Sequence, residues 1–412
     1  MFGDDLDPEE LDQETAALFA PVTKVQTDSQ AAHTQEPFSE VPISKILDNL
    51  PAFFSYSPLV IPLTSASGEG PRSITLARRD LYDARFQLIS EGAPGPDTDD
   101  AKQDRDRALE FLDAPSDLVP GVYEGGLKTW ECSLDLVDYL NSAHHGDVVG
   151  KRVLEIGCGT AVPTLFLLHT LLSAPLSSAA PPKTEFHVQD YNASVLELVT
   201  LPNMLLTWYM SPASSTYRST LPPPESADDD DAHPPADPTT PSNLPLPPAL
   251  KDALTASLDA RGIVLRFFAG SWEGFDPSTT GDGGDGAKNL QYDVVLTSET
   301  IYRSEGLAPL IGLMRAACGA PLLPPPSPSL GELVEQKLKL SPDDDNRNGE
   351  PTESTRASIC LVAAKVLYFG VGGGVIDFVR AVEGPAGRGS VSTVWEKTDG
   401  VGRKVMQVNW DA

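Results

Sequence analysis

The stretch Val153-Leu-Glu-Ile-Gly-Cys-Gly-Thr-Ala-Val-Pro163 decides the fold. Its apolar start predicts a buried strand, its glycines a tight turn, and its last residues the start of a helix. Gly157 and Gly159 allow the backbone to turn sharply and to approach a ligand that a Cβ would block. Pro163 suits the first turn of a helix, where no N–H donor is needed. Val162 stands where the dinucleotide fingerprint has its third glycine, and a purely structural turn would show the same glycine pair.

Outward from this turn, short apolar runs alternate with stretches of helical character. Strands are predicted at 152–156, 185–189, 263–268, 292–297 and 358–369, and helices at 161–172, 195–209, 305–317 and 375–383. The chain then closes with strands at 390–396 and 404–410, which leave no room for a helix between them. This order predicts an α/β fold with a seven-stranded, Rossmann-like sheet that is mostly parallel and carries one antiparallel strand.

The composition limits the kinds of partner. Among 412 residues 59 are acidic and 30 basic, which gives a formal net charge of −29. This balance argues against direct nucleic-acid recognition and favours a basic protein partner. The four cysteines and six histidines show no metal-ligand spacing, so no metal is expected. The acidic start does not resemble a signal peptide, and the longest apolar stretch, 358–379, contains Lys365 and Asp377, so no membrane span is expected.

The organisation along the chain follows from where Pro, Ser and Asp gather. Residues 1–35 are predicted to be a disordered acidic arm, 36–119 an N-terminal accessory segment with strand-like runs at 59–64 and 73–77, and 120–412 the catalytic-size domain. Two stretches within that domain, about 211–248 and 321–355, are predicted to be disordered inserts because they hold too little apolar surface to fold. A charged linker is predicted at 94–106.

Polar and aromatic residues follow the predicted strands at their carboxyl ends, where this kind of sheet binds ligands. The second strand ends in Asp190-Tyr191-Asn192, and a carboxylate there can accept both hydroxyls of a ribose. Ser271 and Trp272 follow the third strand, where Trp272 offers a flat face for an adenine ring. Ser298 ends the fourth strand. Asp190 as a helix N-cap and Trp272 as a core aromatic are the structural alternatives.

Glu155 sharpens the interpretation of the glycine turn. Together with Gly157 and Gly159 it gives the E/D-x-G-x-G pattern of enzymes that use S-adenosylmethionine (SAM), although Ala161 replaces the usual third small residue. Four longer strings then resemble the histidine protein methyltransferase family, which shares the class I methyltransferase sheet with the eukaryotic lysine methyltransferases. They are Pro120-Gly-Val-Tyr-Glu-Gly-Gly-Leu-Lys-Thr-Trp-Glu-Cys132, Gln189-Asp-Tyr-Asn192, Leu296-Thr-Ser-Glu-Thr-Ile-Tyr302 and Lys365-Val-Leu-Tyr-Phe-Gly-Val-Gly-Gly-Gly374.

The resemblance implies a function and several roles. Trp130, Glu131 and Cys132 are expected to line a SAM pocket, and the acceptor to be the tele nitrogen of a histidine in a large-subunit ribosomal protein. The lysine-modifying relatives have Asp-x-x-Tyr where this chain reads Glu299-Thr-Ile-Tyr302, which favours the histidine branch. A monomer that works in the cytoplasm and the nucleus is expected.

Glu299 and Tyr302 are the candidate catalytic residues, with Lys365 and Tyr368 next in the acceptor pocket. A neutral imidazole is already a nucleophile near pH 7, so the enzyme needs control of its tautomer more than a strong base. Glu299 could accept the N–H of one ring nitrogen and leave the lone pair of the other for the methyl group. Helix capping by Glu299 and core packing by the tyrosines are the alternatives to these roles. Two alternative functions remain: a protein-lysine methyltransferase, and a non-catalytic acidic escort for a basic ribosomal protein.

Overall fold

The structure covers most of the predicted catalytic-size domain and about half of the accessory segment. The computed structural model describes residues 37–64, 70, 72–84, 87, 118–119, 123–143, 145–176, 180–222, 233–280, 291–320, 358–368 and 373–411. The predicted arm 1–35, linker 94–106 and insert 321–355 lie outside these residues.

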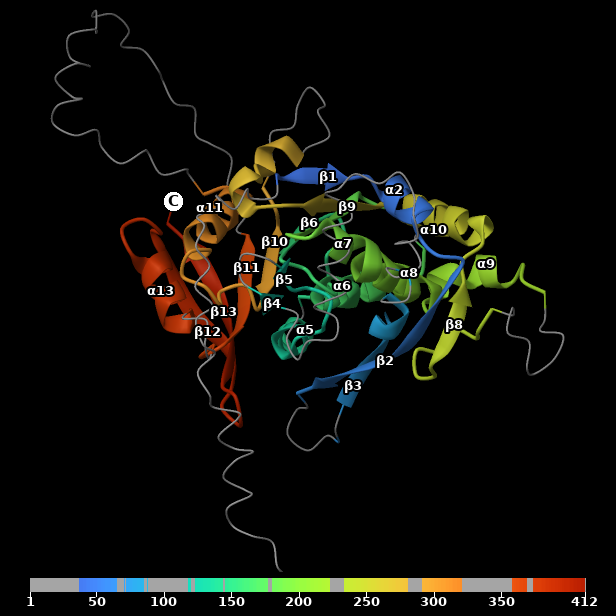
Figure 1. Ribbon diagram of the computed structural model, residues 1–412, viewed down its shortest axis with the longest axis horizontal. Helices are drawn as coiled ribbons and strands as arrows, with labels where there is room; N and C mark the ends of the chain where they lie inside the picture. Colours follow the sequence, from blue (N-terminus) through green and yellow to red (C-terminus); the bar gives the residue numbers. More distant parts are fainter. Residues whose placement is uncertain are drawn as a thin grey trace, which may run out of the picture. The chain divides into compact units, whose positions relative to one another are not determined.

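The central sheet has eight strands (Figure 1). Their spatial order is β1 (Ser39–Val41), β9 (Ile263–Ala269), β7 (Thr184–Asp190), β6 (Arg152–Ile156), β10 (Val294–Ser298), β11 (Ile359–Lys365), β13 (Arg403–Trp410) and β12 (Gly389–Lys397). The five strands from β9 to β11 are parallel, whereas β13 is antiparallel to both of its neighbours. Without β1, the strands run 3-2-1-4-5-7-6 in chain order, which is the class I methyltransferase arrangement. The predicted fold class is confirmed, and β1 adds an unpredicted antiparallel edge strand.

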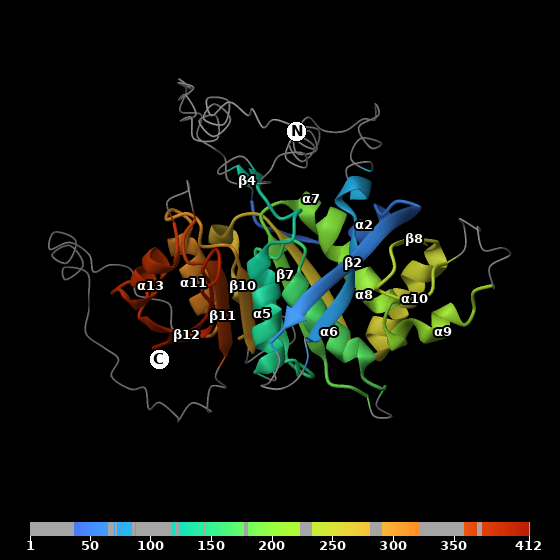
Figure 2. The ribbon, with the colours of Figure 1, turned by 90° about the horizontal axis from the view of Figure 1, so that it is seen from below.

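Helices cover both faces of the sheet because the parallel strands are apolar on both sides. Val153 packs with α5 (Glu131–Ser142), α6 (Val162–Ser173) and α8 (Leu201–Tyr209), and α10 (Pro248–Ala260) joins the same cluster. Its neighbour Leu154 belongs to the other cluster, with α11 (Leu307–Ala317) and α13 (Val375–Glu383). Figure 2 shows α5 and α6 across the sheet, with α11 and α13 beyond β11. The predicted helix 195–209 consists of α7 (Ala193–Val195), a π-helical turn (Leu196–Thr200) and α8.

A second, antiparallel sheet carries the N-terminal strands. It has the order β3 (Arg72–Arg79), β2 (Phe53–Leu63) and β8 (Ser242–Pro245), and α2 (Ile43–Asp48) precedes it. Hydrogen bonds fix it to the main layers. The backbone N–H of Arg79 donates to Oδ1 of Asn203 on α8 over 2.9 Å, and Thr64 donates its N–H and its hydroxyl to Asp138 on α5, each over 2.6 Å. A short hairpin, β4 (Leu118–Val119) and β5 (Tyr123–Glu124), leads into α5.

The prediction that 211–248 is a disordered insert is wrong for the residues described there, 211–222 and 233–248. These residues form a 3-10 turn (Pro212–Ser214), α9 (Ser215–Arg218) and β8. Their few apolar side chains suffice as anchors, since Leu244 and Leu246 are buried, and the Tyr209 hydroxyl donates to the Pro234 carbonyl over 2.6 Å. Sparse anchors of this kind do not show in a composition dominated by Pro, Ser and Asp.

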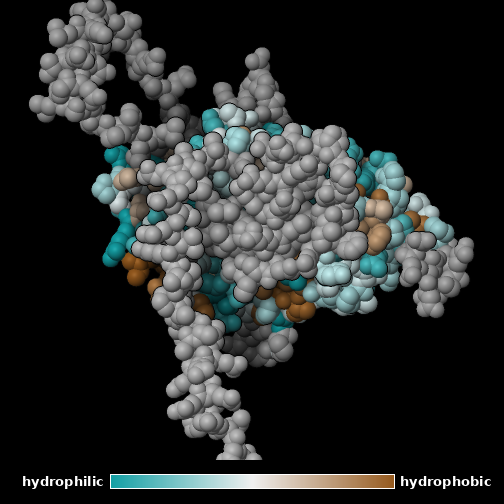
Figure 3. Space-filling model, viewed as in Figure 1, coloured by the Kyte–Doolittle hydropathy of each residue, from teal (hydrophilic) through white to brown (hydrophobic). Residues whose placement is uncertain are grey.

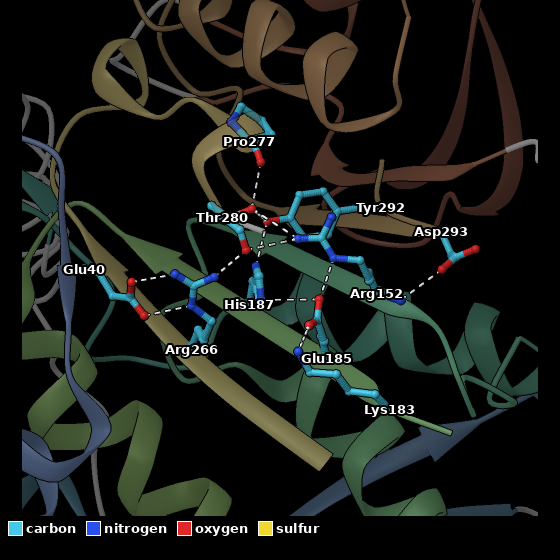
Figure 4. Close-up of polar contacts among 10 residues, drawn as sticks. All are labelled: Glu40, Arg152, Lys183, Glu185, His187, Arg266, Pro277, Thr280, Tyr292 and Asp293. Carbon is cyan, nitrogen blue, oxygen red and sulfur yellow. Dashed lines mark hydrogen bonds and ion pairs between the residues drawn. The ribbon is translucent and has the colours of Figure 1, made fainter. Parts of the chain in front are cut away.

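A buried polar network lies at the opposite half of the strands from the glycine turn (Figure 4). The hydroxyl of Tyr292 lies 2.7 Å from Nδ1 of His187 and 2.9 Å from Oγ1 of Thr280. The Arg152 guanidinium lies over the Tyr292 ring, 4.6 Å from its centroid, and bonds Glu185 over 2.5 Å. Burial, followed by the nearby arginines, lowers the pKa of His187 to about 2, so the folded protein holds a neutral imidazole there.

Where Figure 3 shows described residues, small hydrophobic patches lie among hydrophilic ones. No helix among the described residues is long and apolar enough to cross a bilayer.

His187 should make stability fall as the pH is lowered. Below about pH 6.5 the unfolded chain binds a proton at this residue that the folded chain excludes, at about 1.4 kcal/mol per pH unit. His187→Asn keeps a polar atom near the Tyr292 hydroxyl and removes this proton. Between pH 7 and pH 5 the wild type should therefore lose about 2 kcal/mol more unfolding free energy than the variant. Urea unfolding followed by circular dichroism measures the difference, and parallel pH profiles would contradict the assignment.

Candidate active site

The turn after β6 is built on Gly157. Its φ is +62°, and a Cβ placed there would lie 2.5 Å from Cγ2 of Thr300, so only glycine fits. The Gly157 N–H donates to Oε1 of Gln189 over 3.2 Å. Thr300 in turn bonds Thr297 over 2.7 Å, and the Thr297 hydroxyl donates to the Ile156 carbonyl over 2.8 Å. The loop after β10 therefore packs directly on the glycine turn.

Asp190 holds the same turn from the end of β7. Its Oδ2 accepts the Gly159 N–H over 2.9 Å, and its Oδ1 accepts the Asn192 N–H over 3.2 Å. The Asn192 side chain donates to the Gly125 carbonyl over 3.1 Å, which brings the segment before α5 against the turn. A Cβ at Gly126, where φ is +105°, would lie 3.0 Å from Val195 and 3.2 Å from Oδ2 of Asp190. Asp190 is thus buried at the centre of the predicted ribose site and also organises its backbone.

Glu155 lies beneath the turn and is almost fully buried. Its Oε2 accepts hydrogen bonds from the N–H (3.0 Å) and the hydroxyl of Thr164 in the first turn of α6. Its Oε1 is buried without a hydrogen-bond partner. Burial raises the pKa of Glu155 to about 8, with Asp190 adding to the rise and the Thr164 hydrogen bonds opposing it. An orphaned carboxyl oxygen of this kind fits a cationic ligand group, whose charge would lower the pKa of Glu155 and favour the ionised form.

The third strand brings Trp272 to the turn. The Trp272 indole N–H donates to Oε1 of Gln189 over 2.8 Å, and Nε2 of Gln189 donates to the Gly270 carbonyl over 2.8 Å. A Cβ at Gly157 would be 4.0 Å from the Trp272 ring. Ser271 lies beside it and accepts the Glu273 N–H over 3.4 Å, so its hydroxyl has a capping contact. Gln189 opens the family-like string Gln189-Asp-Tyr-Asn192, but it is not among the predicted site residues because a single polar residue within a strand does not by itself indicate contact with the glycine turn.

A second cluster surrounds Glu299, whose backbone has a φ of +59°. Its Oε2 accepts the Tyr368 hydroxyl over 2.6 Å, and its Oε1 lies 3.6 Å from Nζ of Lys365. Lys365 also pairs with Glu131 over 3.1 Å, and its ammonium lies 4.6 Å from the centroid of the Trp130 ring. The Glu299 side chain thus faces a hydroxyl and an ammonium. It does not cap α11, which begins at Leu307 with Gly306 as N-cap.

Burial and charge act on the same cluster in opposite directions. Burial by itself lowers the pKa of Lys365, but the carboxylates of Glu299 and Glu131 outweigh it and the pKa is raised, so the ammonium persists at pH 7. Burial raises the pKa of the Tyr368 hydroxyl and of the Cys132 thiol, and the charge of Glu299 raises both further. Tyr368 and Cys132 are therefore neutral neighbours of Glu299.

The structure brings most of the predicted residues into these two neighbouring groups. The first holds Glu155, Gly157, Gly159, Asp190, Asn192, Ser271 and Trp272, and the second holds Trp130, Glu131, Cys132, Glu299, Lys365 and Tyr368. Tyr302 borders the second group, with its ring centroid 6.4 Å from that of Tyr368. The Tyr191 carbonyl accepts the Gly270 N–H over 3.1 Å, and Ser298 ends β10 beside Glu299. Thr300 joins the two groups, because it follows Glu299 and packs on Gly157.

Comparisons with known proteins place the chain. No family model matches it. The crystal structure of magnesium protoporphyrin IX methyltransferase from Synechocystis with bound SAH aligns with 79% of the chain and 94% of its own, at 12% identity and a TM-score of 0.28. An alignment that loose does not bear on the fold, which the strand order already establishes.

Histidine protein methyltransferase 1 of Schizosaccharomyces pombe is 30% identical over 370 residues, 87% of this chain and 83% of its own. The Saccharomyces cerevisiae protein of the same name is 31% identical over 316 residues, 74% and 67% of the two chains. At 30% and 31% identity to these two proteins over most of its length, this chain belongs to the histidine protein methyltransferase 1 family.

Proposed function

We propose that this protein is a SAM-dependent protein-histidine N-methyltransferase that modifies the tele nitrogen of a histidine in a basic, large-subunit ribosomal protein. The observation that carries the proposal is the contact of Thr300 with Gly157, which sets the Glu299 cluster beside the glycine turn in a member of this family. The net charge of −29 suits a basic partner. A monomer that acts in the cytoplasm and the nucleus belongs to the same proposal.

The residues around the glycine turn fit SAM. The buried Oε1 of Glu155 has no partner and suits the ammonium of the methionyl end. The carboxylate of Asp190 at the end of β7, beside the glycine turn, suits the hydroxyls of a ribose, and Trp272 offers a ring face for the adenine. Bound SAM supplies an electrophilic methyl group on a sulfonium. The work left to the chain is to hold the acceptor in line with that methyl group.

Glu299 is suited to orient an imidazole acceptor. Tyr368 already occupies its Oε2, whereas its Oε1 faces the Lys365 ammonium at 3.6 Å without a hydrogen bond among the described residues and can accept an N–H from the ring. An imidazole that donates its Nδ1–H to this oxygen presents the lone pair of its other, tele nitrogen. Oε1 can also receive the proton that the ring gives up once the tele nitrogen is alkylated. Lys365 and Tyr368 hold the carboxylate in this orientation.

Incubation with labelled SAM and large-subunit ribosomal proteins that lack prior modification tests the activity. Label should enter a basic protein, and fragmentation by mass spectrometry should place the methyl group on histidine, because methyl-histidine and methyl-lysine give distinct fragments. Methyl-lysine in place of methyl-histidine would show a lysine methyltransferase. Tight binding of the ribosomal protein, with neither transfer of label nor binding of SAH, would show the non-catalytic escort.

Glu299→Ala should lower turnover about 10²- to 10⁴-fold, because the acceptor loses the group that fixes its tautomer and receives its proton. The affinity for SAH, measured by calorimetry, should stay within about twofold of wild type, since Glu299 lies on the acceptor side. Glu305→Gln is the matched control, because Glu305 is an exposed carboxylate of the same loop. Full activity of Glu299→Ala would remove the proposed role.

Gly157→Arg should abolish SAH binding, since Thr300 leaves no room even for a Cβ and the side chain must fill the turn. Gly312→Ala is the control: this glycine lies in α11, and a Cβ there meets no atom within 4 Å. Calorimetry gives the affinities, and circular dichroism shows whether the variants fold. Unchanged SAH affinity in a folded Gly157→Arg protein would place the cofactor elsewhere.

A further inference from the structure

Arg78 connects the accessory sheet, which is the second sheet of β3, β2 and β8, to the glycine turn. It lies near the end of β3, and its Nη1 donates to Oγ1 of Thr129 over 3.1 Å. Oγ1 of Thr129 lies 3.1 Å from Oγ1 of Thr160, which stands within the glycine turn, directly after Gly159. The guanidinium of Arg78 on the accessory sheet is therefore linked to the glycine turn through the hydroxyls of Thr129 and Thr160.

The guanidinium of Arg78 is only partly satisfied by its neighbours. Its Nε is buried without a hydrogen-bond partner, and its Nη1 contacts the neutral hydroxyl of Thr129 rather than a carboxylate. Burial lowers the pKa of Arg78, and the charge of Asp80 opposes this only in part. The next residue shows the contrast: Arg79 bonds the Asp83 carboxylate, the Leu198 carbonyl and the side chain of Gln87. A half-buried guanidinium whose inner N–H has no acceptor is costly and indicates an anion as its missing partner.

The amino acid end of SAM carries both charges that the turn could pair. The unpartnered Oε1 of Glu155, beneath the glycine turn, suits the ammonium. Arg78 contacts the same turn through Thr129 and Thr160 and suits the carboxylate. We propose that Arg78 binds the methionyl carboxylate of SAM and of its product SAH. This inference rests on the proposed function and gives the accessory sheet a direct part in cofactor binding.

Calorimetry with two ligands tests the role of Arg78. SAH carries the carboxylate, whereas decarboxylated SAH keeps the adenosine, the sulfur and the ammonium and lacks only that group. Arg78→Met should weaken SAH binding about 10- to 100-fold, the range of a hydrogen bond to a charged group, and leave decarboxylated SAH within about twofold. Arg78→Lys, which keeps the charge without the fork of donors, should fall between wild type and Arg78→Met for SAH.

Arg72→Met is the control, because Arg72 is exposed at the other end of β3, and it should bind both ligands as wild type does. Equal weakening of both ligands in Arg78→Met would show a structural role and overturn the inference, as would unchanged SAH binding. Binding of neither ligand by the wild-type protein would instead contradict the proposed function itself.

Discussion

The buried side-chain amide of Gln189 is the interaction on which the site depends. Its oxygen accepts the Gly157 N–H and the Trp272 indole N–H, and its nitrogen donates to the Gly270 carbonyl. One amide thus joins the ends of three neighbouring parallel strands. Their carboxyl ends meet at one edge of the sheet, and each leaves polar backbone groups there that need partners. With those groups satisfied, the glycine turn and the indole ring are held in place by the interior of the protein.

Charge is arranged differently in the two halves of the site. On the cofactor side, Glu155 and Arg78 each bury an atom without a hydrogen-bond partner, one on an acidic and the other on a basic side chain. On the acceptor side, the Lys365 ammonium lies over the Trp130 ring and close to the carboxylates of both Glu131 and Glu299, so each charged group there has a partner of opposite sign. A zwitterionic end of a ligand suits the first half, and a neutral ring suits the second.

Sequence predicted most of the sheet and the glycine turn, because buried strands and tight turns leave short-range patterns in residues such as Val153 and Gly157. It missed what long-range contacts create. β1 has three residues, too few for a period, and exists because β9 needs an edge partner. The 211–248 stretch folds on a few anchors, and Arg78 gains its place only through Thr129, far along the chain. Whether Asp190 serves a ribose as well as the backbone depends on a ligand, which no pattern contains.

The pairing of Phe53 with Pro245 has a consequence for synthesis on the ribosome. The edge of β2 that pairs with β8 stays without its partner while about 190 further residues are translated. At ordinary rates of translation this takes roughly 10 to 40 s. Through that interval the nascent chain carries an apolar hairpin with an unpaired edge, a species prone to non-native association. The length of chain between β3 and β8 therefore determines when the hairpin of β2 and β3 gains its third strand. Until then, a chaperone that covers the hairpin is of most use.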